Sequence, residues 1–143
     1  MTKSLGRNTG KLAMNASQEM LSVIIDGSPI PSFVIDRKHS VTHWNTAVEV
    51  LTGIKKNEIL GTDRQWQAFY DEKRPILADL ILDGASLDKI EFYYGCRYKK
   101  SHLIDGAFEV EDFFPAFGQH GTWLHFTASP IRNKNGEVVG VVE

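Results

Sequence analysis

The side chains that could carry out covalent or acid–base chemistry are few and scattered along this 143-residue chain. Its single cysteine, Cys96, cannot form an internal disulfide or a thiolate zinc site. No two of the five histidines have a spacing typical of a metal site, and no nucleophile stands at a recognisable spacing from a base. The sequence therefore predicts no catalytic residue and no metal ligand, although residues distant in sequence can still meet in the folded chain.

Two short segments carry groups that are used in phosphate binding and in acid–base catalysis. The segment Gly6–Lys11 has the outline of a phosphate loop, but it is one residue short and no Ser or Thr follows the lysine. Glu109, Glu111 and Asp112 form an acidic run, and paired carboxylates can act as acid and base. Because no apolar pocket residue separates the environments of Glu109 and Glu111, we expect a solvated strand edge there instead.

Aromatic side chains in the middle of the chain are the main candidates for a ligand pocket. They recur at helical spacing, and Tyr and Trp carry polar groups that orient ligands, although plain core packing is the alternative for such a stripe. His125 shares a predicted strand face with Trp123, where it is either a pocket donor or pH-responsive group, or a hydrogen-bonded structural residue. The predicted pocket residues are Trp66, Phe69, Tyr70, Leu77, Ile81, Tyr94, Tyr98, Trp123 and His125.

The composition indicates one ordinary soluble domain without a nucleic-acid partner. Hydrophobic residues make up 42% of the chain and charged residues 24%, as in other globular proteins. The formal net charge of −2 leaves no basic excess to neutralise a phosphate backbone. No apolar run reaches the roughly 18 residues of a membrane span, and the N-terminus has no secretory apolar segment. We therefore expect a cytoplasmic protein with no direct membrane contact.

The N-terminal part is predicted to be a mobile tail followed by a flanking helix. Residues 1–14 are mostly small or polar, which is typical of a tail. Asn15 can cap a helix over residues 15–27, and Pro29 prevents its continuation. The remaining residues, 28–143, form the predicted main domain. The apolar face of the helix is the predicted dimer interface and consists of Met20, Leu21, Ile24 and Ile25.

The main domain is predicted to contain two strands, several short helices and then three strands. Asn45 is placed to cap the first of these helices and Gly53 to end it, whereas residues 98–107 have no clear period. Strands that are segregated from helices indicate an α+β fold, in which helices pack on one face of an antiparallel sheet. The predicted strands cover residues 32–36, 40–44, 108–114, 122–131 and 138–142.

Three segments at the two ends of the main domain form a characteristic series. The first joins Pro31–Asp36 to Val41–Asn45, the second reads N-T-A…L-T-G…E-I-L-G from Asn45 to Gly61, and the third is Pro130–Glu143. In this order they resemble the opening hairpin, the N-x-A…LTG…E-I-x-G run and the closing hairpin of the PAS family. The resemblance implies a PAS fold, with a five-stranded antiparallel sheet, short helices on one face and an N-terminal flanking helix.

The resemblance to PAS domains also implies a sensor rather than an enzyme. Such modules belong to bacterial signal-transduction proteins, most often histidine kinases of two-component systems, and act on a C-terminal output domain of the same polypeptide. A small molecule would bind between the sheet and the helices over residues 65–70 and 74–83, and would bias their packing. Its identity stays open, because residues 62–120 are longer than the generic pattern.

Two cofactors of the PAS family do not fit this sequence. Gly95-Cys96-Arg97-Tyr98 is similar to the cysteine motif of flavin-binding light sensors, but it lies too far beyond Gly61, and glycine replaces the asparagine before the cysteine. Haem-binding members commonly use a histidine on the helix that here spans residues 74–83, which has none. We therefore expect neither flavin nor haem, and a structural role for the Cys96 thiol.

A ligand-free module for dimerisation or protein interaction is the alternative function. The face formed by Met20, Leu21, Ile24 and Ile25 is more apolar than a lone helix exposes, so it either joins two copies in a homodimer or packs on its own sheet. Catalysis is the third possibility, and a deep cleft that holds a titratable pair would support it.

Overall fold

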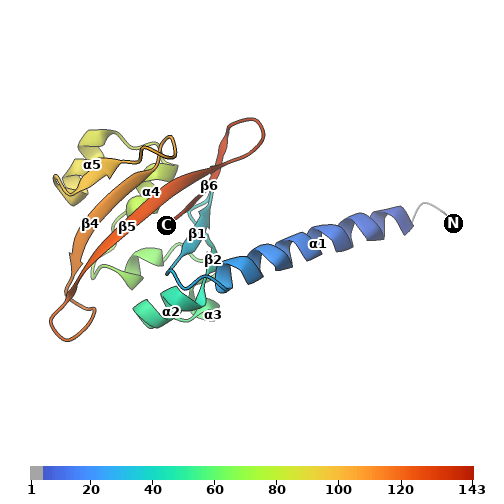
Figure 1. Cartoon of the computed structure of the whole chain (residues 1–143), viewed down its shortest axis with the longest axis horizontal. Helices are drawn as coiled ribbons and strands as arrows, with labels where there is room; N and C mark the ends of the chain where they lie inside the picture. The colour runs from blue at the N-terminus through green and yellow to red at the C-terminus, as the bar shows by residue number, and fades with distance from the viewer. Residues whose placement is uncertain (1–4) are drawn as a thin grey trace.

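A six-stranded antiparallel sheet forms the body of the domain (Figure 1). In the computed structural model, which describes the backbone of residues 5–143 and side chains from residue 16, the strand order is β2-β1-β6-β5-β4-β3. The strands are β1 (Phe33–Asp36), β2 (Val41–Trp44), β3 (Tyr98–Lys100), β4 (Phe108–Phe114), β5 (Thr122–Arg132) and β6 (Val138–Val142). The predicted α+β fold with an antiparallel sheet is therefore confirmed.

The two terminal hairpins meet in the sheet, as the sequence predicts. Strand β1 pairs with β6 through Val34–Val142 and Ile35–Val141, and β6 also pairs with β5. Gly140 makes this meeting possible, because a Cβ at this position would lie 2.5 Å from the carbonyl oxygen of Ile35. The first and last strands of the chain are thus held together at the point where both border the helical layer.

The predicted number of five strands is corrected to six by β3. This strand lies within residues 98–107, for which the sequence shows no clear period, and pairs with β4 through Tyr98–Val110 and Lys100–Phe108. Three residues are too short for alternation to stand out. Pairing with a neighbouring strand, rather than local preference, decides such a segment.

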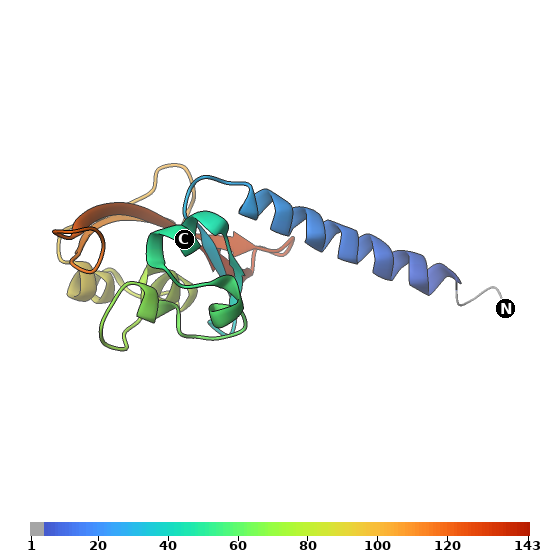
Figure 2. The ribbon, with the colours of Figure 1, turned by 90° about the horizontal axis from the view of Figure 1, so that it is seen from below.

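The short helices cover one face of the sheet (Figure 2). Helix α4 packs against β5 and β6 and carries the centre of the core, where Leu77 and Leu80 are at most 1% exposed. The helices are α2 (Thr46–Thr52), α3 (Lys56–Ile59), the 3₁₀ helix η1 (Gln65–Ala68), α4 (Leu77–Leu82) and α5 (Leu87–Tyr94).

Asn45 caps α2 and links three elements. Its Oδ1 accepts hydrogen bonds from Val48 N–H at 2.9 Å and from Ser32 N–H at 3.0 Å. Its Nδ2 donates to the carbonyl oxygens of Ile30 and Ile25, so the end of the N-terminal helix, the segment before β1 and α2 are joined at one buried side chain. The predicted cap is confirmed.

Helix α1 (Leu5–Asp26) projects from the body of the domain (Figures 1 and 2). It begins earlier than the predicted start near Asn15, so residues 5–14 are helical rather than a tail, and residues 1–4 lie outside the described residues. Lys11, Leu12, Ala13 and Met14 are good helix formers, which favours a start of the helix before Asn15. Its C-terminal end is fixed by a 2.7 Å ion pair between Lys56 Nζ and Asp26 Oδ1.

Candidate functional site

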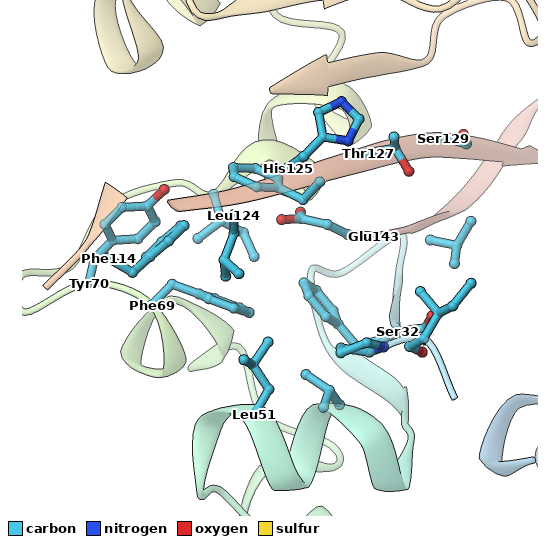
Figure 3. Close-up of a pocket in the computed structure, with 17 residues that line it drawn as sticks. Ser32, Leu51, Phe69, Tyr70, Phe114, Leu124, His125, Thr127, Ser129 and Glu143 are labelled. Atoms are coloured by element: carbon cyan, nitrogen blue, oxygen red, sulfur yellow. The ribbon is translucent and has the colours of Figure 1, made fainter. Parts of the chain in front are cut away.

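A cavity of about 470 Å³ lies between the sheet and the helical layer, beside α2 (Figure 3). Val48 and Leu51 border it from α2, Phe69 from the segment after η1, and Leu124 and Phe126 from β5. Most of the surface that these residues present is apolar. A cavity of this size and character is typical of sites for small molecules.

Aromatic rings form one wall of the cavity. The Phe69 ring centroid lies 5.9 Å from that of Phe33 on β1 and 5.9 Å from that of Phe114 on β4, the latter edge to face. Tyr70 lies beside Phe114 at 5.6 Å. Because edge-to-face and tilted contacts of this kind are favourable, the rings hold one another in place.

Glu143 supplies the carboxyl group of the cavity wall (Figure 3). Its main chain exchanges two hydrogen bonds with Phe33, of 2.9 and 3.0 Å, and its Oε2 accepts one from Ala78 N–H at 2.7 Å. The residue as a whole keeps some accessible surface, but its carboxyl is enclosed by protein. Burial is the main cause that raises the pKa of Glu143 to about 8, followed by the opposing hydrogen bond from Ala78 and the repulsion of Asp79.

A cluster of tyrosines and one arginine lies behind the aromatic wall. The guanidinium carbon of Arg74 lies 3.8 Å from the Tyr70 ring centroid and 5.0 Å from that of Tyr94, which is cation–π geometry. The Tyr70 hydroxyl donates to Asp112 Oδ2 at 3.2 Å, and burial holds the pKa of Tyr70 well above its usual value. Both tyrosines are therefore neutral, and the hydrogen of Tyr70 is already engaged.

The predicted pocket residues on the helices divide into two groups. Phe69 and Tyr70 line the cavity. Leu77, Ile81 and Tyr94 lie in the closed core instead, and Trp66 packs against that core. Helix α4 lies directly on β5 and β6, so its side chains fill the space beside this helix in which the ligand was expected.

The predicted pocket residues on the strands lie mostly on the outer face of the sheet. Along β5 the residues alternate, so Phe126 and Ala128 face the core while Trp123 and His125 face outward. Trp123 is 63% exposed, and the strand at His125 borders the cavity while its side chain is 54% exposed. Tyr98 borders a separate shallow hollow, which is lined by Cys96 and by residues of β3 and β4.

Sequence reasoning missed Glu143, Phe33 and Leu51 as cavity residues. A signal for Glu143 was present, because it continues the inward alternation that begins with the fully buried Val141. A glutamate at an inward position after an apolar strand indicates a functional role, because glutamate is rarely buried without a partner. Leu51 had no such signal, since it looks like any other apolar residue on a short helix.

A second group of titratable side chains lies at the β1–β2 turn and α4. His39 adopts a left-handed backbone conformation with φ of 64°, and its ring nitrogens lie 2.7 Å from Asp79 Oδ1 and 2.8 Å from Asp83 Oδ1. Burial lowers the pKa of His39, but the hydrogen bonds and charges of Asp79 and Asp83 outweigh it and raise the pKa above 6.5. Asp79 also accepts from Gln65 Nε2 and from Ile76 N–H, so it joins three elements.

Neither a cluster of metal-binding side chains nor a membrane-spanning helix occurs in the described part of the chain. Within residues that the structure describes, no group of three or more His, Cys, Asp or Glu side chains is arranged to hold a metal ion. The helices in the same range lack the length and apolar content of a membrane span.

Comparison with known proteins identifies the fold. Residues 19–82 match the family model described as the PAS fold. The chain is similar to the structure of an RNA-binding Light-Oxygen-Voltage receptor, with a TM-score of 0.54, 20% identity and coverage of 87% of this chain and 31% of that chain. It is also similar to the PAS domain of Bordetella pertussis BvgS, with a TM-score of 0.48, 19% identity and coverage of 88% and 80% of the two chains. A comparison with curated protein sequences found no match.

The antiparallel sheet, the helices on one face and the cavity between the two layers define an α+β domain with room for a small molecule. Residues 19–82 of this chain match the PAS fold, and the antiparallel sheet with its covering helices agrees with that match.

Proposed function

We propose that this PAS domain senses a small molecule in the cavity beside α2 and relays its binding without catalysis. The cavity of about 470 Å³ with its aromatic wall is the observation that carries this proposal. The sequence suggested a site against the helices over residues 65–70 and 74–83. The cavity instead lies closer to α2 and β1. A ligand there would contact both layers of the fold at once.

The cavity also borders the strand through which a signal would leave. Val142 and Glu143 line it at the end of β6, and β6 is paired with both β1 and β5. A ligand that moves β6 relative to α2 would change the position of the segment after Glu143. We propose that this segment leads to a C-terminal output domain in a cytoplasmic signalling protein, with a histidine kinase as the first candidate.

The experiment compares two tryptophan variants of adjacent residues on α2. Leu51→Trp fills the cavity, whereas Val50→Trp adds the same side chain at a position that is 79% exposed. Native mass spectrometry identifies a co-purified molecule, and a thermal-shift screen finds further ligands. At about 100 times Kd a ligand should raise the Tm of the wild type and of Val50→Trp by roughly 5–10 °C.

Leu51→Trp should lose that increase while remaining folded by circular dichroism. Equal increases in both variants would place the ligand elsewhere and contradict the proposal. The absence of any ligand response in the wild type would contradict it as well.

A homodimer through α1 is the second candidate function, and it does not require a ligand. Met20, Leu21 and Ile24 are 60%, 54% and 61% exposed on a helix that projects from the body, and Ile25 is half-buried. Light scattering should show a dimer for the wild type and for Gln18→Glu, and a monomer for the double variant Leu21→Glu/Ile24→Glu. An unchanged mass in the double variant would exclude this face as the interface.

A further inference from the structure

The polar groups of the cavity restrict the chemistry of the ligand that it can take. Among the described residues that line it, the ionisable ones are Tyr70, His125 and Glu143. The His125 side chain lies on the outer face of the sheet, and the Tyr70 hydroxyl donates to Asp112. The Glu143 carboxyl is therefore the ionisable group that remains to meet a ligand.

The position of Glu143 is fixed by its neighbours in the fold. Two main-chain hydrogen bonds to Phe33 hold it in the sheet, and the 2.7 Å bond from Ala78 N–H engages Oε2. No described residue donates to Oε1, and no described Lys, Arg or His forms a salt bridge with the carboxyl. In Figure 3 the carboxyl points into the space between β5 and α2, toward Leu124 and Phe69.

An enclosed carboxyl without a cationic partner keeps its proton. The charged groups that face Glu143 are Asp79 on α4, which disfavours ionisation, and Arg74, which favours it weakly, while Tyr70 and Tyr94 are neutral. With a pKa of about 8, the neutral form predominates about tenfold at pH 7. Since Oε2 accepts from Ala78 N–H, the proton lies on Oε1, which has no other partner.

We propose that the cavity selects a neutral, largely apolar ring compound with one hydrogen-bond acceptor, such as a carbonyl oxygen or a ring nitrogen, which accepts from Glu143 Oε1. The aromatic wall favours rings, and a buried donor in a largely apolar wall rejects a ligand that leaves it unpaired. An anionic ligand would find no cation among the described lining residues. This inference rests on the proposed sensory function of the same cavity.

Three compounds of nearly equal shape test the proposal. Benzophenone carries the acceptor, diphenylmethane lacks it, and benzhydrylamine replaces it with a cation. Affinities are measured by ligand-observed NMR and calorimetry on the wild type, Glu143→Gln, Glu143→Met and the control Glu137→Gln, which alters an exposed glutamate. Circular dichroism confirms that each variant is folded.

We expect benzophenone to bind about tenfold more tightly than diphenylmethane, as one net hydrogen bond provides. This preference should persist in Glu143→Gln, whose amide can donate while its oxygen accepts from Ala78, and in Glu137→Gln. It should disappear in Glu143→Met. In the wild type it should fall as the pH is raised through about 8, where Glu143 ionises, and in Glu143→Gln it should not change with pH.

Three results would overturn the proposal in distinguishable ways. Equal binding of benzophenone and diphenylmethane removes the role of Glu143 but leaves the cavity as a ligand site. Tighter binding of benzhydrylamine, with an affinity that rises with pH, shows that the ionised carboxylate recognises a cation instead. Failure of all three compounds to bind the wild type, together with an unresponsive thermal-shift screen, contradicts the sensory function itself.

Discussion

Two titratable groups flank helix α4, and the pKa of each is raised for a different reason. Glu143 meets the start of the helix at Ala78 N–H and is neutral, because its carboxyl is enclosed and has no cation in salt-bridge contact. His39 lies against Asp79 and Asp83 of the same helix, and its pKa is raised above 6.5 because two carboxylates outweigh its partial burial. The partner within contact distance, rather than burial alone, decides whether a group in this domain carries charge.

The raised pKa values of Glu143 and His39 have the same consequence for folding. Both groups have a raised pKa in the folded chain, so both bind more protons in the folded state than in the unfolded one. The free energy of unfolding should therefore fall as the pH rises through the window between the unfolded and folded pKa values. Variants at each group can separate the two contributions.

The largest expected effect concerns Glu143. Its pKa rises from 4.5 to about 8 on folding, so its stabilising proton is fully present below pH 4.5 and is lost as the pH rises to about 8. Each pKa unit corresponds to about 1.4 kcal/mol, which gives a loss of up to about 5 kcal/mol for the wild type. Urea unfolding as a function of pH should show a much flatter profile for Glu143→Gln. Parallel profiles would show that Glu143 ionises normally in the folded chain.

Asp79 should give the next largest effect. Its side chain is 11% exposed and accepts from Ile76 N–H, Gln65 Nε2 and His39. Asp79→Ala leaves buried donors unpaired and should cost about 3 kcal/mol in the free energy of unfolding. Asp83→Ala is the matched control, because it also removes a carboxylate from His39 but at a side chain that is 52% exposed. Similar losses in both variants would contradict the central position of Asp79.

His39 should give the smallest effect. Asparagine tolerates a positive φ, so His39→Asn removes both ion pairs with little backbone strain. The wild type should be more stable than this variant below about pH 6.5, by less than about 1 kcal/mol. The difference should vanish as the pH rises through the folded pKa and should shrink in salt. A difference that is independent of pH would show that the ion pairs do not contribute.

The sequence predicts the elements of this domain better than its cavity. Asn45 and Gly53 act locally, through a cap and a left-handed terminator, so they identify α2 from spacing alone. The closing hairpin is equally local. The third strand of the chain, β3, depends on β4 for its pairing and leaves no comparable pattern in three residues.

The location of the cavity depends on distances between layers, which residue spacing does not encode. Leu77 on α4 and Leu51 on α2 are both apolar residues on short helices, yet Leu77 is fully buried in the core and Leu51 borders open space. The difference arises because α4 lies directly against β5 and β6, whereas the cavity separates α2 from β5. Alternation along β5 likewise leaves two sets of side chains that could face the core, and the sequence does not decide between them.

The protonation of Glu143 is the point on which the account of the cavity depends most directly. A carbon-13 NMR titration of the Glu143 side-chain carboxyl in the wild-type protein measures it without any substitution. We predict an apparent pKa of about 8, which rises further when benzophenone is bound. Ionisation near 4.5, together with the exposed glutamates of the chain, would contradict the neutral carboxyl and the ligand chemistry inferred from it.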